Sequence, residues 1–324
     1  MASLQKICWG VLLLKCFTTS AQVKWQNVDS NFQPLPKNFH IYKSTDSLDG
    51  KPFVAYYVSA KLKDKKLNFT TDTTYKRRLT PQQFFQKNNN PLLVVNGTFF
   101  SFETNQNLNV VVKEGKVLSH TVRKIKSRTD TTIVIDNPMV RSAIGISKKR
   151  KADVAWIKTD SSNSNVRAIQ LPAINGHSVS FSVEGTTETI PVCFSSFSEW
   201  KVKTAIGGGP VLLQKGEISI ANKEEEMFAG KSGLIDKHPR TAMGYTTDGN
   251  LIIMVVEGRN PNLADGVSLP QLAQLLKDIG CVEALNLDGG GSSCMLVNGK
   301  ETIKPSDKTG QRPVPAVFII QQKK

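Results

Sequence analysis

The sequence predicts an α+β or mixed α/β fold: a single domain with one large mixed β-sheet, rich in strands and poor in helices. Short apolar runs with many β-branched residues recur along its 324 residues, as expected of buried strands. Only two segments carry complete helix signals, beginning near residues 81 and 268. Residues 251–287 have the pattern of a strand, a helix and a second strand, the order of a crossover unit with two neighbouring strands.

A signal peptide is expected at residues 1–21. Lys6 supplies its positive charge and residues 7–14 its apolar run, which is too short to span a bilayer as a mature helix. Small residues place the cleavage between Ala21 and Gln22, with an apolar N-terminal anchor as the alternative. No later segment of the sequence is long and apolar enough to cross a membrane. The mature protein is therefore expected to be exported, periplasmic or extracellular, without stable membrane insertion.

Both predicted helices have recognisable ends. Thr80 is a good N-cap for a helix over Pro81–Lys87, because proline stands at the first helical position and glutamine at the third. Ser268 forms a capping box with Gln271 at the start of the second helix, which presents one apolar stripe. Gly280 stands where a left-handed C-terminal cap is needed.

Strands separated by turns are expected over most of the remaining chain. Residues 22–80 are predicted to be an N-terminal arm with the first strands. Residues 114–116 are predicted to be a hairpin turn and residues 136–138 a second turn. Ala221–Gly230, which contains three consecutive glutamates, is predicted to be a surface loop or a short helix. The predicted strands are 53–60, 67–73, 92–95, 131–135, 140–146, 166–171, 179–183, two strands around a glycine bend within 205–214, 241–246, 251–256, 282–287 and 315–321.

The chain is basic, with a formal charge of +15, or +13 without Lys6 and Lys15. Its basic runs at 61–66 and 148–151 are expected to be solvated loop ends or to attract an anionic substrate or polymer. Nucleic acid is not expected as a partner, because no aromatic residues interleave with the basic runs and the chain is predicted to be exported. The sequence leaves the oligomeric state open.

Three cysteines follow the predicted signal peptide: Cys193, Cys281 and Cys294. An odd number argues against a disulfide framework. Cys281 and Cys294 each begin an apolar segment, so both are expected to be buried small hydrophobes. No thiol nucleophile is proposed.

Candidate chemistry gathers where predicted strands end. In Asp288–Ser293, three glycines let the backbone turn tightly and present several N–H groups to one anion, and two serines add hydroxyl groups. Asp288 is then a general acid or base, or a residue that orients one; a tight turn capped by the aspartate is the alternative. If the flanking strands are parallel, Glu257 and Arg259 emerge at the same edge of the sheet.

Three further segments carry candidate functional groups. His238 could transfer a proton near neutral pH, and Arg240 could hold a phosphate or a carboxylate. Asn96 could bind a sugar hydroxyl or hold a turn, while the phenylalanines at 99 and 100 are expected in the core. Gly207–Gly209 is expected to let two backbones pass closely, or to line a pocket.

No cofactor is predicted. The sequence has no pair of histidines at helical spacing, no calcium loop of alternating Asp and Asn, and no nucleophile elbow. The sequence does not decide whether a divalent ion is bound.

As an ordered set, six motifs resemble the phosphodiester glycosidase domain family. The resemblance covers residues 96 to the C-terminus, within an expected domain of residues 81–324. The family often has Asp where this chain has Glu257. The motifs are Asn96–Phe100, Ile206–Pro210, His238–Gly244, Val256–Arg259, Asn286–Ser293 and Arg312–Pro315.

The resemblance implies hydrolysis of a sugar joined through its anomeric carbon to a phosphodiester, giving free sugar and a phosphomonoester. Such a reaction needs stabilisation of phosphate charge and of an oxocarbenium-like sugar. The implied catalytic residues are Asp288, Glu257 and His238. The implied substrate-binding and phosphate-binding residues are Arg240, Thr241, Arg259, Gly289, Gly290, Gly291, Ser292, Asn96 and Arg312.

Two alternative functions stay open on the sequence alone. A phosphodiesterase would cleave the P–O bond and release a sugar phosphate. A non-catalytic module would bind anionic exopolysaccharide, as the positive charge of the chain permits. The sugar, the aglycone and the stereochemical outcome are not specified by the sequence.

Overall fold

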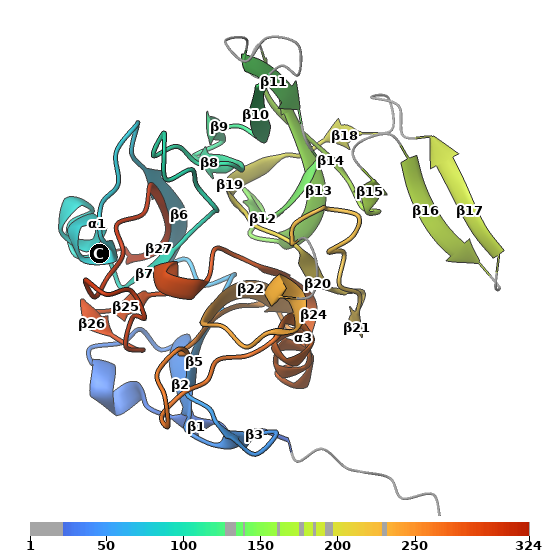
Figure 1. Ribbon diagram of the computed structural model, residues 1–324. Coiled ribbons are helices and arrows are strands. Elements are labelled where there is room, and N and C mark those ends of the chain that lie inside the picture. Colours follow the sequence, from blue (N-terminus) through green and yellow to red (C-terminus); the bar gives the residue numbers. More distant parts are fainter. Residues whose placement is uncertain are drawn as a thin grey trace, which may run out of the picture.

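The computed structural model describes residues 22–126, 134–138, 140–160, 163–174, 178–183, 186–191, 197–228 and 232–323 (Figure 1). The predicted signal peptide, Cys193 and the first part of the predicted strand at 131–135 lie outside the described residues. Among the described residues, no helix combines the length and the apolar character that crossing a membrane would require.

An eight-stranded sheet contains both strands of the predicted crossover unit. Every strand pairing in it is antiparallel. In spatial order its strands are β1 (Gln26–Asn27), β2 (Phe39–Ser44), β5 (Ala55–Lys61), β23 (Asn250–Val256), β22 (Arg240–Thr246), β24 (Cys281–Asn286), β20 (Val211–Gln214) and β21 (Glu217–Ile218).

The prediction that the strands at 251–256 and 282–287 are neighbours is wrong, because β22 lies between them. The chain folds β22 and β23 into a hairpin before the helix, so the position beside β23 is already filled. Both strands pair antiparallel with β22 and therefore run in the same direction. Val256 lies opposite Arg240, and Asn286 lies opposite Ala242. The predicted convergence of the two strand ends at one sheet edge is confirmed.

Two further large sheets complete the fold, and both are antiparallel. The predicted single mixed sheet is therefore wrong, although the prediction of many strands and few helices is confirmed. The five-stranded sheet has the order β26 (Lys300–Glu301), β25 (Met295–Val297), β7 (Leu93–Asn96), β27 (Ala316–Gln322) and β6 (Leu67–Thr73). The seven-stranded sheet has the order β18 (Ser198–Glu199), β14 (Asn163–Ile169), β13 (Ala152–Asp160), β12 (Arg141–Ser147), β19 (Val202–Gly207), β8 (Val111–Lys113) and β9 (Lys116–Ser119).

The remaining elements are short, and the small sheets lie at the periphery (Figure 1). The small sheets are β3 (Ser47–Leu48) with β4 (Lys51–Pro52), β10 (Val122–Lys126) with β11 (Val134–Pro138), and β15 (Ala173–Ile174), β16 (Ser178–Val183) and β17 (Thr186–Pro191). The helical elements are η1 (Asp29–Phe32), α1 (Pro81–Lys87), α2 (Ser232–Ile235), α3 (Leu269–Asp278) and η3 (Gly290–Ser292).

One apolar core joins the three large sheets. Ile253 of β23, Phe318 of β27 and Ile144 of β12 all belong to it and are nearly inaccessible to solvent. The stripe of α3 packs on the other face of the eight-stranded sheet, where Leu272 meets Met254 in a second cluster. Each sheet thus buries one face against the others, which fixes the sheet edges relative to one another.

Local signals in the sequence are confirmed at both helices. Thr80 and Ser268 each accept a hydrogen bond from the backbone N–H three residues on, and the glutamine there bonds back to the cap. Gly280 has a φ of +94°, as a left-handed cap requires.

Two loop predictions are wrong. Residues 136–138 continue strand β11 instead of forming a turn, because they pair with β10. Glu225, within the predicted surface loop, is buried. Its carboxylate accepts hydrogen bonds from the Trp156 indole, the Ser142 hydroxyl and the Val211 backbone, which draw it beneath the sheet.

Candidate active site

A cavity of about 250 Å³ opens at the sheet edge where β23 and β24 end. It gathers residues that are far apart in the sequence, because β22, β23 and β24 deliver their connecting segments to this one edge. It is called the arginine pocket below. Its lining residues are Phe99, Phe228, Gly233, His238, Arg240, Arg259, Asn286, Asp288, Gly289, Gly290, Gly291 and Arg312.

Asp288 provides the one carboxyl group among the described residues that line the arginine pocket. It follows β24, and its backbone N–H donates to the Gly97 carbonyl at 3.1 Å. Its Oδ2 atom is inaccessible to solvent and has no hydrogen-bond partner among the described residues. Burial raises the pKa of the Asp288 carboxyl to about 7, against the opposing effects of a Ser292 hydrogen bond and the charge of Arg312.

Asn96 and Thr241 hold this aspartate from behind and do not line the pocket. The Asn96 side-chain amide donates to the Asp288 carbonyl at 2.6 Å. Its oxygen accepts from the Thr241 hydroxyl at 2.8 Å and from the Cys294 backbone N–H at 3.1 Å. Asn96, Thr241 and Cys294 are all buried. These contacts tie β7, β22 and the turn after β24 into one rigid support.

Arg240, the first residue of β22, is a buried cation without a carboxylate partner among the described residues. Its guanidinium donates to three backbone carbonyls, including that of Val267 at 3.1 Å and that of Gly233 at 2.8 Å. Burial lowers its pKa to about 10, with a smaller effect from nearby Arg259. A buried positive charge held by neutral dipoles is suited to an anionic ligand.

Arg259 lies at the mouth of the pocket with His238. Its backbone adopts a φ of +58°, and its Nη2 atom lies 3.4 Å from Nδ1 of His238. A Cβ atom added at Gly290 would lie 3.2 Å from the Arg259 guanidinium. The side chain thus lies directly over the glycine turn, exposed to solvent.

Arg312 closes the opposite part of the pocket. Its Nε donates to Asp307 at 2.7 Å, and its Nη1 donates to the Ser292 hydroxyl at 3.4 Å. A Cβ atom at Gly291 would lie only 2.2 Å from Arg312 Nη2. A side chain at position 291 would therefore displace the guanidinium of Arg312 from the turn. Ser292 itself does not line the cavity and acts on it through Arg312 and Asp288.

Glu257 does not line the arginine pocket. Its buried carboxylate accepts from the Asn260 amide at 2.8 Å and from the Lys304 backbone N–H at 3.0 Å. Both oxygens are thereby engaged in holding neighbouring loops.

Several lining residues of the pocket were not predicted from the sequence. Phe99, predicted to be in the core, is half-buried and lines the pocket with Phe228, whose ring centroid lies 6.2 Å away. Asn286 lines it too: its amide donates to the Gly209 carbonyl at 2.9 Å, while its buried Oδ1 has no partner among the described residues. An asparagine just before Asp288 was a signal, since strand-end amides often orient ligands. No sequence signal marked Phe228.

The glycine bend at 207–209 allows the close backbone approach that the sequence predicted. A Cβ atom at Gly208 would lie 2.3 Å from the Asn286 carbonyl oxygen. The bend therefore brings β20 against β24 directly beneath the pocket.

Three arginines, one buried carboxyl group and a glycine turn in one cavity define a hydrolase-type site for an anionic substrate. The comparison with known families agrees with this class. The model of the phosphodiester glycosidase family matches residues 89–321. The chain belongs to the phosphodiester glycosidase family.

Curated relatives match over short segments. A 71-residue segment is 42% identical to the SPbeta prophage-derived protein YomE of Bacillus subtilis and covers 22% of this chain and 11% of that protein. A 102-residue segment is 38% identical to N-acetylglucosamine-1-phosphodiester α-N-acetylglucosaminidase of Mus musculus and covers 32% of this chain and 19% of that enzyme. The matches thus span under a fifth of these relatives' length.

Solved structures share the fold over most of the chain. The auto-inhibited catalytic domain of the zebrafish N-acetylglucosamine-1-phosphodiester α-N-acetylglucosaminidase has a TM-score of 0.60 at 19% identity, covering 93% of this chain and 89% of that chain. A Burkholderia pseudomallei protein described as exported has a TM-score of 0.58 at 15% identity, covering 85% of this chain and 75% of that chain.

Proposed function

We propose that the protein hydrolyses the glycosidic bond of a sugar-1-phosphodiester, releasing free sugar and a phosphomonoester. The observation that carries the proposal is the Asp288 carboxyl, whose buried Oδ2 has no hydrogen-bond partner among the described residues, in a cavity that also contains three arginines. Family membership and the names of the curated enzymes support the same chemistry.

Arg240 and Arg259 would bind the phosphodiester, with backbone N–H groups of the glycine turn beside them. Arg240 is positioned before the substrate arrives, because three carbonyls fix its guanidinium. Charge that develops on the departing phosphate would therefore meet a preorganised cation. Arg312 stands on the other side of the turn, held by Asp307.

Asp288 would activate water. Its raised pKa suits a general base that works near neutral pH. Asp288 takes a proton from water as the water oxygen bonds to the anomeric carbon. The bond from that carbon to the phosphate oxygen then breaks, and its electron pair leaves with the phosphomonoester. A phosphate is a fair leaving group, so no strong acid is needed. Direct attack inverts the anomeric configuration.

The other predicted site residues take supporting roles in this proposal. Asn96, Thr241 and Ser292 would position Asp288 and Arg312, and Glu257 would hold the loop that carries Arg259. His238 would stay at the pocket mouth beside Arg259, placed to exchange a proton with the leaving phosphate or with solvent.

The substrate proposal extends to the sugar. N-acetylglucosamine is the sugar in the name of the mouse enzyme, so esters of N-acetylglucosamine-1-phosphate are the first substrates to test. A polymeric exopolysaccharide substrate is the extension that the positive charge of the chain supports. Export after cleavage near Ala21 and Gln22 is proposed from the apolar run at residues 7–14.

Purified protein should be incubated with the methyl ester of N-acetylglucosamine-1-phosphate in oxygen-18 water, with and without a chelator. We expect free sugar carrying the label and unlabelled methyl phosphate. Label in phosphate, with sugar phosphate as product, would show P–O cleavage and overturn the proposal.

Matched variants locate the site. Asp288→Asn should lower kcat/KM by about 10²-fold to 10⁴-fold, the usual contribution of a general base. Arg259→Gln should mainly raise KM, because it removes a cation at the pocket mouth. Lys37→Gln removes a positive charge on the far N-terminal segment and should change neither constant.

A further inference from the structure

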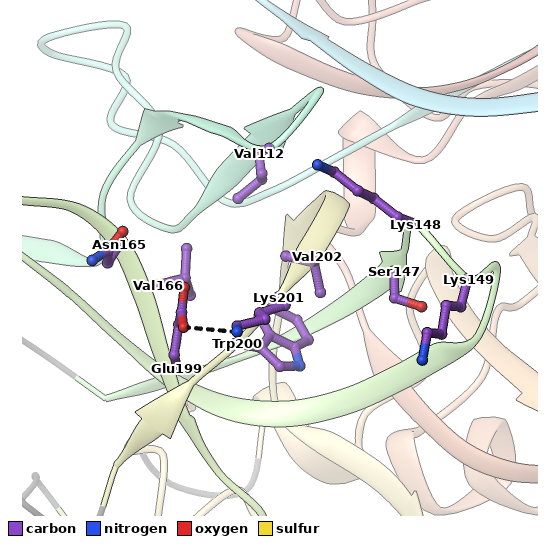
Figure 2. Close-up of a pocket in the computed structure, with 11 residues that line it drawn as sticks. Val112, Ser147, Lys148, Lys149, Asn165, Val166, Glu199, Trp200, Lys201 and Val202 are labelled. Atoms are coloured by element: carbon purple, nitrogen blue, oxygen red, sulfur yellow. Dashed lines mark ion pairs between the residues drawn. The ribbon is translucent and has the colours of Figure 1, made fainter.

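A second cavity, of about 590 Å³, lies on the outer face of the seven-stranded sheet (Figure 2). It shares no lining residue with the arginine pocket and belongs to a different sheet. It is called the tryptophan cavity below. Its lining residues are Val112, Gly115, Ser147, Lys148, Lys149, Asn165, Val166, Glu199, Trp200, Lys201 and Val202.

The floor of the tryptophan cavity is apolar. Val112 of β8 and Val166 of β14 are buried members of a separate hydrophobic cluster, against which Val202 and Trp200 pack. This cluster faces away from the shared core of the three large sheets. No described helix is among the residues that line the cavity above it.

Trp200 is held in a fixed position at the cavity wall. Its indole Nε1 donates to Asp153 Oδ2 at 2.6 Å, and the Gln170 amide donates to the same carboxylate. A Cβ atom at Gly145 would lie 2.6 Å from the ring, so the glycine makes the space that the indole fills. Gly145 and Asp153 are cross-strand partners. Of these two residues, Gly145 leaves the space for the ring and Asp153 fixes its orientation through the indole N–H.

Positive charge surrounds this aromatic wall. Lys148 and Lys149 stand in the turn between β12 and β13, and Lys201 follows Trp200 (Figure 2). Glu199 pairs with Lys201 at 3.4 Å. No carboxylate of the described residues lies within ion-pair distance of the Lys148 or Lys149 amine. The described residues that line the cavity therefore carry a net positive charge, because Glu199 is the one carboxylate among them and it pairs with Lys201.

We propose that the tryptophan cavity binds a segment of an anionic polysaccharide. A sugar ring presents an apolar face of C–H groups that packs on a fixed indole, and its hydroxyl groups remain in water. Acidic substituents on the polysaccharide would pair with Lys148 and Lys149. The volume falls within the range of small-ligand sites, about 300–1,000 Å³, and fits a short stretch of sugars. This binding is independent of the hydrolysis proposed at the arginine pocket.

The test is affinity electrophoresis of the full protein in gels that contain dextran sulfate or neutral dextran of the same length. Dextran sulfate has no phosphodiester, so its binding is read separately from turnover. We expect retardation by dextran sulfate only, weakened about tenfold in Lys148→Gln/Lys149→Gln, a ratio that corresponds to roughly 1.4 kcal/mol. The charge-matched control, Lys37→Gln/Lys51→Gln, should bind as the wild type does.

Tryptophan fluorescence locates the contact. Dextran sulfate should change the emission of the wild type, and the change should disappear in Trp200→Phe, while Trp156 stays buried and silent. Equal loss of binding in the two lysine double variants would overturn the proposal, as would an unchanged response in Trp200→Phe. Equal competition by poly(acrylic acid), which has charge but no sugar rings, would also overturn it in favour of an acidic-chain site.

Discussion

Replacing Asp288 with asparagine should make the protein more stable at alkaline pH while it removes activity. The wild-type carboxyl is buried and has a pKa raised to about 7 from 3.8. Above pH 7 the folded protein must hold a charge that the unfolded chain would expose to water. Asparagine has nearly the same shape and no charge, so the variant lacks this cost.

The magnitude follows from the pKa difference. The folded state binds a proton at Asp288 over a pH range in which the unfolded chain has released it, so stability falls as pH rises from 3.8 to about 7. At about 1.4 kcal/mol per pH unit, the total is about 4 kcal/mol. Below pH 3.8 both states are protonated and the contribution vanishes. The variant should therefore gain about 4 kcal/mol on the wild type between pH 4 and pH 8.

Urea unfolding of both proteins from pH 4 to pH 8 measures this difference. Burying the asparagine amide changes the free energy of unfolding by the same amount at every pH. The pH dependence of the difference between the two proteins therefore reports the titration of Asp288 alone. Asp248→Asn is the control: the Thr246 hydroxyl lowers the pKa of that exposed carboxylate, and a small change of opposite sign is expected. A stability difference between the two proteins that is independent of pH would show that the pKa of Asp288 is not raised in the folded state.

Four further outcomes are expected. The kcat/KM of the wild type should rise as pH increases through about 7, because Asp288 must lose its proton to act as a base; a fall in a pH-rate profile would assign it as an acid instead. Gly291→Ala should displace the guanidinium of Arg312, 2.2 Å from the new methyl group, and raise KM with little change in kcat. Glu225→Ala should cost at least about 3 kcal/mol in urea unfolding, because four buried donors lose their acceptor. Ser268→Ala should cost about 1 kcal/mol, seen as a lower Tm, since it removes the cap of α3.

Signals that act within a few residues were predictable from the sequence. The caps at Thr80 and Ser268 form as expected because the bonding groups lie three residues apart and need no other part of the chain. The hairpin turn at 114–116 forms for the same reason, with Glu114 and Gly115 both at positive φ.

Features that depend on distant residues were not predictable. Three consecutive glutamates are typical of a solvated surface, yet Glu225 is buried because Trp156, Ser142 and Val211 supply donors from other strands. Phe99 has the character of a core residue, and only the position of Phe228 shows that it lines a pocket. The order of residues in a single sequence does not show which distant residues will pair.

The position of the candidate site was predictable even though the sheet topology was not. Two strands that run in the same direction end at the same edge of a sheet. This holds for parallel neighbours, and it also holds for β23 and β24, which are separated by the antiparallel strand β22. The direction in which each side chain points was not predictable from the sequence. After β23 the chain enters a loop, where Glu257 turns inward to the Lys304 backbone and Arg259, at positive φ, covers Gly290. Residues two positions apart thus reach opposite environments, and alternation within a strand no longer applies there. Strand-end motifs therefore indicate where a site lies, whereas the roles of the individual residues depend on loop conformation.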